Sequence, residues 1–202
     1  MTKLLYQGHA SFRLTTDGGS VVYIDPFARV GLEAPADIVL ITHEHHDHNN
    51  VDLLTLSEGC LVVRSSDMLA NGKHLTKDLG PIVVEATPAC NGNHPIDSCI
   101  GFLIYVDGLT LYFAGDTSKI DYMSTVLPGK NIDYAFLPCD GVYNMDRPEA
   151  EECARAIGAK HTVPIHTAPS ASGDECAFDA AKAEAFEAPG KIVIRPGEEI
   201  TL

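Results

Sequence analysis

Residues 37–48 read DIVLITHEHHDH, in which an apolar run passes directly into a cluster of histidines and acids. The run is apolar through its middle, as in a strand that is covered on both faces, so we expect a strand at Asp37–Thr42. The six residues that follow are four histidines and two acids. So dense a set inside the chain and next to an apolar strand indicates a metal site rather than a solvated polar loop.

Regular secondary structure does not bring these side chains together. On a helix, His43, His45, Asp47 and His48 point about 0°, 200°, 40° and 140° around the axis. On a strand, His48 points to the opposite side from the other three. A turn at the strand end can wrap all four around a pair of ions. Neutral imidazoles and a carboxylate suit zinc, iron or manganese, so the residues alone leave the metal open.

The spacing within residues 43–48 resembles the HxHxDH signature of the metallo-β-lactamase superfamily. Two further motifs of that family follow in the expected order, the glycine-aspartate pair Gly115-Asp116 and a histidine at the end of a late strand, His166. His94 is the best match to the intervening histidine motif, although the usual glycine around that histidine is absent. In length and in motifs such as YIDPF and LPCDG, the chain looks closest to small metal-dependent hydrolases that include ascorbate-6-phosphate lactonase-like proteins.

The resemblance implies an α/β (α+β) fold, the four-layer αββα sandwich, with residues 1–202 as a single domain and the metals at one edge between the sheets. It also implies seven ligands: His43, His45 and His94 on one ion, Asp47, His48 and His166 on the second, and Asp116 between them. The ions are two divalent cations, with Zn²⁺ favoured and Mn²⁺ or Fe²⁺ as alternatives. Such a site keeps positions open for water and substrate, as catalytic sites do.

The activity implied is that of a metal-dependent hydrolase, of lactonase or phosphoesterase type. A bridging hydroxide attacks an ester, lactone or phosphoester of a small anionic substrate, and Asp47 is the catalytic residue that orients it. One alternative is di-iron redox or oxygen chemistry on the same fold. Against this alternative, the chain has no flavin-binding domain to deliver electrons. Another is a non-catalytic metal-binding protein, which an incomplete ligand set would favour.

Several residues near the motifs carry two interpretations each. Asp25 either accepts a hydrogen bond from a ligand imidazole or caps the turn at Pro26. For His9 we favour a packing role, and for His46 a place at the surface or behind the ligands. Residues 143–146 either line the substrate cleft or serve as turn and helix N-cap.

Strands and helices are expected on both sides of the motifs. The strands are expected at residues 3–6, 11–15, 21–25, 37–42, 61–64, 82–86, 100–106, 109–114, 132–137, 161–165 and 191–195. A helix is expected to begin after an Asp146 N-cap and to end at Gly158. A second helix is expected from about Cys176 or Phe178 to Ala188, and a third, short one at Val51–Ser57.

Composition limits the partners. The 202 residues are 45% hydrophobic and 21% charged, as in folded globular proteins. Fourteen basic against 28 acidic residues give a net charge of −14, which disfavours nucleic acid and anionic membranes and leaves a small-molecule substrate as the expected partner. The sequence is compatible with a homo-oligomer, and the expected location of the protein is the cytoplasm. Six scattered cysteines without a CxxC pair are expected to be reduced.

Overall fold

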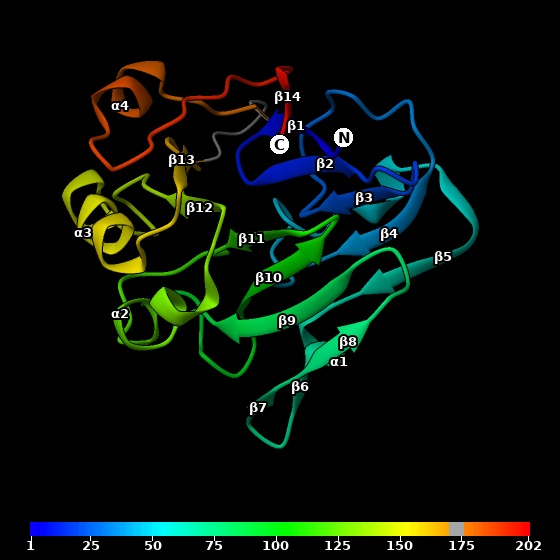
Figure 1. The fold of residues 1–202 in the computed structure, drawn as a ribbon, viewed down its shortest axis with the longest axis horizontal. Helices are drawn as coiled ribbons and strands as arrows, with labels where there is room; N and C mark the ends of the chain where they lie inside the picture. The colour runs from blue at the N-terminus through cyan, green and yellow to red at the C-terminus, as the bar shows by residue number, and fades with distance from the viewer. Residues whose placement is uncertain (170–175) are drawn as a thin grey trace.

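The computed structural model describes residues 1–169 and 176–202. Two six-stranded sheets pack against each other (Figure 1), with a two-stranded hairpin beside them. The first sheet has the order β14-β1-β2-β3-β4-β5 and the second the order β13-β12-β11-β10-β9-β8. The strands of the first sheet are β1 (Lys3–Gly8), β2 (Ser11–Thr15), β3 (Val21–Ile24), β4 (Ala36–Leu40), β5 (Leu56–Val63) and β14 (Glu199–Thr201). Those of the second are β8 (Thr76–Asp78), β9 (Val83–Pro88), β10 (Ile100–Val106), β11 (Leu109–Phe113), β12 (Tyr134–Pro138) and β13 (His161–Ile165).

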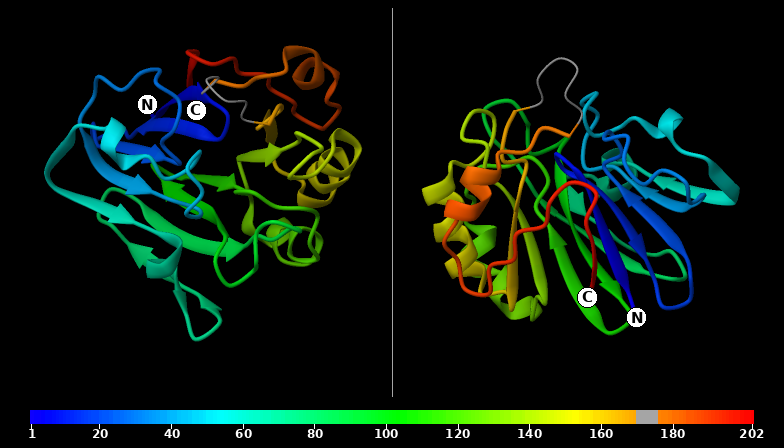
Figure 2. Two further views of the ribbon diagram at one scale, coloured as in Figure 1. Left: turned by 180° about the vertical axis from the view of Figure 1, so that it is seen from behind. Right: turned by 90° about the horizontal axis from the view of Figure 1, so that it is seen from above.

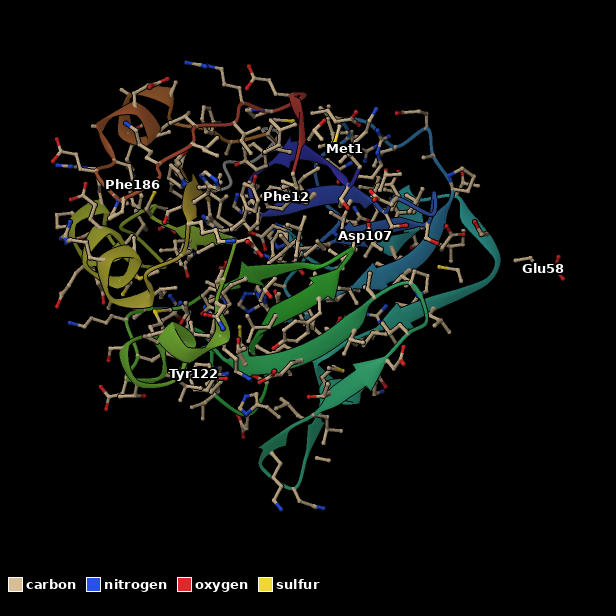
Figure 3. All side chains as sticks on the ribbon, viewed as in Figure 1. Met1, Phe12, Glu58, Asp107, Tyr122 and Phe186 are labelled. Carbon is tan, nitrogen blue, oxygen red and sulfur yellow. The ribbon has the colours of Figure 1, made fainter. Side chains whose placement is uncertain are left out.

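The core lies between the two sheets, and strand alternation explains how it is filled. In β4, Ile38 and Leu40 belong to the core cluster, whereas Val39 and Ile41 belong to a separate cluster that also contains Tyr23. Successive side chains of a strand point to opposite faces, so an apolar strand such as β4 serves both clusters. Phe12 lies in this core (Figure 3), with the centre of its ring 5.2 Å from that of Phe113.

Helices cover the outer face of the second sheet (Figure 2). These elements are α2 (Tyr122–Thr125), the 3₁₀ helix η2 (Leu127–Lys130), α3 (Arg147–Ile157) and α4 (Ala180–Ala185). On the first sheet, Val51 of the 3₁₀ helix η1 (Val51–Leu53) and Leu32 pack on the cluster that contains Val39. The remaining elements are α1 (Ser65–Met68) and the hairpin of β6 (Leu69–Ala70) and β7 (Lys73–His74). The expected αββα sandwich is confirmed.

The expected helix after Asp146 is confirmed at both ends. The Asp146 side chain accepts a hydrogen bond from the Glu149 N–H, Pro148 lies in the first turn, and Gly158 ends the helix with a φ of 68°. Apolar residues of α3 recur three or four positions apart and pack on the second sheet, so one face of the helix is buried. The second expected helix is shorter, Ala180–Ala185, because Asp179 caps it by accepting from the Lys182 N–H.

Two expected elements are wrong. Residues 191–195 form no strand, only an isolated bridge between Lys191 and Thr162. The last strand is instead β14, which pairs with β1 after a turn that Gly197 makes with a φ of 88°. The helix expected at Val51–Ser57 is only the short η1, because the chain from Leu56 onward pairs with β4 and so satisfies its backbone groups in the sheet.

Membrane-spanning helices and disulfides can be assessed for residues 1–169 and 176–202. No helix there is both long and apolar enough to cross a membrane. No disulfide links any of the six cysteines, and Cys99, Cys139 and Cys153 are buried.

Candidate metal centre

Strand direction brings the polar motifs of both sheets to one edge. In the first sheet β1, β3 and β4 run the same way, and His9, Asp25 and residues 43–48 follow their carboxyl ends. In the second sheet β9, β11, β12 and β13 run the same way, and they are followed by His94, Asp116, Asp140 and His166, in that order. Residues that follow parallel strands gather at one end of a sheet, where open α/β sheets also bind their ligands.

The residues predicted as ligands lie in three overlapping groups. The groups are His43, His45 and His94; His43, His48 and Asp116; and His9, Asp47, His48 and His166. Within each group the potential ligand atoms lie within 4.8 Å of one another. His43 and His48 each belong to two groups, so the three form one continuous cluster. The structure therefore brings together all seven predicted residues and adds His9.

Asp116 lies at the middle of the cluster. One of its carboxylate oxygens, Oδ2, is 3.5 Å from His94 Nε2 and 3.6 Å from His166 Nε2. The other, Oδ1, is 3.5 Å from His48 Nε2. Gly115 precedes Asp116 in a tightly packed turn. Its φ is +66°, and a Cβ there would lie 2.5 Å from the Ile100 carbonyl oxygen. The backbone thus requires glycine at the position before Asp116.

The donor atoms that face the cluster fit divalent cations. His43 Nε2, His48 Nε2 and Asp116 Oδ1 are buried and have no hydrogen-bond partner among the described residues. Buried polar atoms without a partner are costly, so such atoms in a native fold call for an explanation. Imidazole nitrogens and carboxylate oxygens are the ligands that zinc, manganese and iron accept, and a cation between them would satisfy each of these atoms.

Asp25 orients two of the imidazoles from behind. It accepts hydrogen bonds from the Thr42 N–H at 2.8 Å and from the Thr42 hydroxyl at 2.7 Å, and its Oδ2 lies 2.9 Å from His48 Nδ1. The Thr42 hydroxyl donates to Asp25, so at 3.0 Å from His43 Nδ1 it accepts a hydrogen bond from that ring. With both Nδ1 atoms donating, Nε2 is the atom that the rings of His43 and His48 have left to bind a metal.

A second chain of hydrogen bonds runs from His94 to Asp140, which lies beside His166. His94 Nδ1 lies 2.7 Å from Asn91 Oδ1, Asn91 donates to Asn144 Oδ1 at 2.9 Å, and Asn144 donates to Asp140 Oδ2 at 2.8 Å. The same Asp140 oxygen lies 3.1 Å from His166 Nδ1. Both imidazoles have Nε2 near Asp116, and behind them the network binds His94 through Asn91 and places the Asp140 carboxylate next to His166.

The electrostatics of the cluster differ from one histidine to the next. Burial, and then the neighbouring His48, lower the pKa of His43 to about 2. Burial also disfavours a charge on His48, but Asp116, Asp25 and Asp47 outweigh it and raise the pKa of His48 to about 9. Burial alone would raise the pKa of Asp116, yet the imidazoles of His48, His166 and others hold it well below its usual range.

Comparison with known proteins identifies the family. The sequence model of a beta-lactamase superfamily domain matches residues 3–166. A UPF0173 metal-dependent hydrolase from Methanoregula boonei is 34% identical over 182 residues, which cover 81% of each chain. The chain belongs to the metallo-β-lactamase superfamily. Within it, the chain is a member of the UPF0173 family of metal-dependent hydrolases.

Two further comparisons cover nearly the whole chain. A UPF0173 metal-dependent hydrolase from Pyrococcus furiosus is 30% identical over 232 aligned positions, with full coverage of both chains. The solved structure of Igni18, a metallo hydrolase from Ignicoccus hospitalis, superposes with a TM-score of 0.73 at 23% identity and covers 98% of this chain and 97% of its own. The fold of a metallo-β-lactamase superfamily protein therefore extends beyond the part that the family model matches.

Sequence reasoning missed or left open four residues around this metallo-β-lactamase centre. His9 was expected to pack, and it is fully buried, but its Nε2 also lies 3.3 Å from Asp47 Oδ2. Its backbone φ of 55° is rare for residues other than glycine, and no feature of the sequence predicts this conformation. Asp25 has the predicted hydrogen bond to an imidazole. Asn144 joins the network behind the ligands, and Asp140 had no predicted role.

Two residues of the motif lie at the surface. His46 is exposed and belongs to none of the three groups, with its Nδ1 3.8 Å from Asp47 Oδ1. Glu44 points away from the cluster toward Arg64, with which it forms contacts of 2.7 and 2.9 Å. The HxHxDH motif of this superfamily member thus separates into four residues that face the centre and two that face outward.

Proposed function

We propose that the protein hydrolyses an ester, lactone or phosphoester of a small molecule with two divalent metal ions, Zn²⁺ being favoured. His43, His45 and His94 hold one ion, Asp47, His48 and His166 hold the other, and Asp116 lies between them. The observation that carries the proposal is the convergence of three buried, unpartnered atoms, His43 Nε2, His48 Nε2 and Asp116 Oδ1, on one place. Metal-dependent hydrolase is the activity of the family to which the chain belongs.

When bound, two such ions supply a hydroxide nucleophile at neutral pH and polarise the oxygen of the group under attack. The protein holds the geometry that this chemistry needs. Asp25 and Thr42 fix the imidazoles of His43 and His48, and Asn91 fixes that of His94. Because these side chains are set by hydrogen bonds before substrate binds, little reorganisation is needed during the reaction.

Asp47 is the residue to which we assign proton handling. It is half-buried, and its Oδ2 lies 3.3 Å from the buried His9 Nε2. Burial, and then the neighbouring His166, lower the pKa of His9 to about 4, so His9 is neutral at physiological pH. A neutral imidazole can hold Asp47 in place without neutralising its charge. Asp47 then orients the nucleophile and passes a proton to the leaving group.

A small molecule without an extended anionic backbone is the proposed partner. The net charge of −14 repels polyanions, whereas the metal ions would supply a local attraction for an anionic group. Lactones head the proposed substrates because of the motif resemblance of residues 23–27 and 137–141, and phosphodiesters follow.

The test is a substrate screen on the metal-free protein reloaded in turn with Zn²⁺, Mn²⁺ and Fe²⁺. We expect turnover of at least one lactone, ester or phosphodiester, and a loss of at least about 10²-fold in kcat for Asp47→Asn, whose metal content is measured in parallel because Asp47 is also a proposed ligand. Substitution of the exposed His46 by Ala is the matched control and leaves kcat unchanged. Oxygen consumption with iron and a reductant, without turnover of any ester, would instead favour redox chemistry at the same site.

A further inference from the structure

A cavity opens on one side of the metal centre. It has a volume of about 330 Å³ and is bordered by His43, His45 and His94. Its other walls are the first two residues of α1 and the segment 93–99. Asp47, His48, Asp116 and His166 do not line it, so it adjoins only the ion assigned to His43, His45 and His94. A volume near the lower end of the range for small-molecule sites fits a compact substrate.

The charges around this cavity are negative. Glu44 and Asp97 line it, and no lysine or arginine does so within the described part of the chain. Arg64, which precedes α1, forms an ion pair with Glu44 through contacts of 2.7 and 2.9 Å. Asp97 is exposed and forms no ion pair with any residue in the ranges 1–169 and 176–202. A part of the substrate that extends away from the ion and carries a negative charge would therefore meet Asp97, with no lysine or arginine among the described lining residues to offset the repulsion.

The cavity also offers neutral hydrogen-bonding groups. The hydroxyls of Ser65, Ser66 and Ser98 and the amide of Asn93 come from its two walls. Ser65 is 5% exposed, and its hydroxyl makes no hydrogen bond to another described residue. The Ser98 hydroxyl donates to the Pro95 carbonyl at 3.2 Å and so remains able to accept. Hydroxyls that both donate and accept suit a ligand that carries hydroxyls of its own.

We propose that this cavity binds an uncharged, hydroxyl-bearing part of the substrate, so that neutral polyhydroxylated lactones or esters are hydrolysed and their phosphorylated counterparts are poor substrates. This inference rests on the proposed function and narrows it, because the resemblance alone implies a small anionic substrate. Asp97 is the specificity-determining residue. It excludes a second negative charge by repulsion and accepts hydrogen bonds from the substrate's hydroxyls.

The first experiment compares two lactones that differ by one phosphate, δ-gluconolactone and δ-gluconolactone 6-phosphate, on the zinc-loaded protein at low salt. We expect kcat/KM to favour the neutral lactone by at least about tenfold, and Asp97→Lys to reduce that preference at least about fivefold. Glu58→Lys is the matched control, since it changes net charge equally and Glu58 points away from the body of the molecule (Figure 3). Asp97→Asn gives an intermediate preference with less disturbance of the fold. A preference for the phosphorylated lactone, or equal effects of the two lysine substitutions, would overturn the proposal.

The second experiment measures the charge of the cavity without turnover. In Ser66→Cys, the rates of modification at position 66 by an anionic and a cationic methanethiosulfonate reagent are followed by peptide mass spectrometry. We expect the cationic reagent to react at least about fivefold faster, an advantage that Asp97→Lys removes and Glu58→Lys keeps. Equal rates, or a faster anionic reagent, would overturn the inference. If neither lactone is hydrolysed while the cationic reagent reacts faster, the proposed hydrolysis fails for these substrates and the charge selectivity of the cavity stands.

Discussion

Asp25 Oδ2 lies 2.9 Å from His48 Nδ1, and the same carboxylate accepts a hydrogen bond from the Thr42 hydroxyl that in turn contacts His43 Nδ1. One buried acid thereby fixes two of the imidazoles that face the metal centre. Asp25 has a φ of 45°, and His9 and His166 also have positive φ. Such conformations concentrate where the surrounding structure enforces a precise geometry, and here they stand at three strand ends around one site.

Substitution of Asp25 by Ala should weaken metal binding. Loss of the carboxylate frees the rings of His43 and His48, and loss of a partner behind a ligand typically costs about 10- to 100-fold in affinity. Asp25→Asn keeps an acceptor for Thr42 and should lose less. The measurement is competition for Zn²⁺ against a chromophoric chelator. Unchanged affinity in Asp25→Ala would show that the hydrogen bonds do not orient the ligands.

Metal affinity should rise with pH through the neutral range. Aspartates around His48 overcome its burial and raise its pKa from 6.5 to about 9, so this ring carries an extra proton at pH 7 in the metal-free protein. That proton must leave when Nε2 binds a metal, so affinity should increase up to about tenfold per pH unit below the pKa and level off above it. Calorimetry in buffers of different ionisation enthalpy counts the protons released. Asp25→Asn removes one of the charges that raise this pKa and should shift the dependence to lower pH, whereas flat affinity from pH 6 to pH 9 would contradict the assignment of His48.

Asn144 should couple the two halves of the centre. Its amide joins Asp140 to Asn91, and hence the residue behind His166 to the residue behind His94. We expect Asn144→Ala and Asn91→Ala each to lower the affinity for one of the two ions by about tenfold, and the double variant to lose less than the sum of the two. Tyr143→Phe, next to Asn144 and exposed, is the control. Strictly additive losses would mean that the two amides do not act through one chain of hydrogen bonds.

Gly115→Ala should destabilise the fold more than Gly108→Ala. Both glycines have positive φ, where an L-residue costs about 1–2 kcal/mol. At Gly108 nothing lies within 4 Å of an added Cβ, whereas at Gly115 the Ile100 carbonyl oxygen would be 2.5 Å away. Urea unfolding of the metal-free variants separates the two effects. Equal losses at both positions would show that the close approach beside Asp116 relaxes freely.

The fold and most of the centre could be predicted because the signals were local. The apolar run of β4 and the histidines that follow it lie within twelve residues. Asp146 and Gly158 are of residue types that commonly begin and end a helix, and they predicted both ends of α3. The Asn91–Asn144 contact spans 53 residues and depends on how two loops meet, which no local pattern encodes. The β14 strand was missed because its three residues are mostly polar and exposed, and only pairing with β1 defines them as a strand.

The position of His9 beside Asp47 shows the same limit from the other side. A lone histidine between two short strands fits packing, and its ring does pack, with its centre 3.7 Å from that of His166. Its second role appears only because Asp47, 38 positions later in the chain, lies beside it at the same sheet edge. Proximity that depends on topology is visible only once the strands have been placed.

The number of metal ions bound per chain distinguishes a dinuclear centre from an empty cluster of histidines. Elemental mass spectrometry is applied to untagged protein purified without added metal or chelator, and to the variants His48→Ala and His166→Ala. We expect about two ions per wild-type chain and about one in each variant, with the ion beside His43, His45 and His94 retained. Near-zero metal in the wild type, with no uptake on reconstitution and no change in thermal stability, would contradict a dinuclear centre.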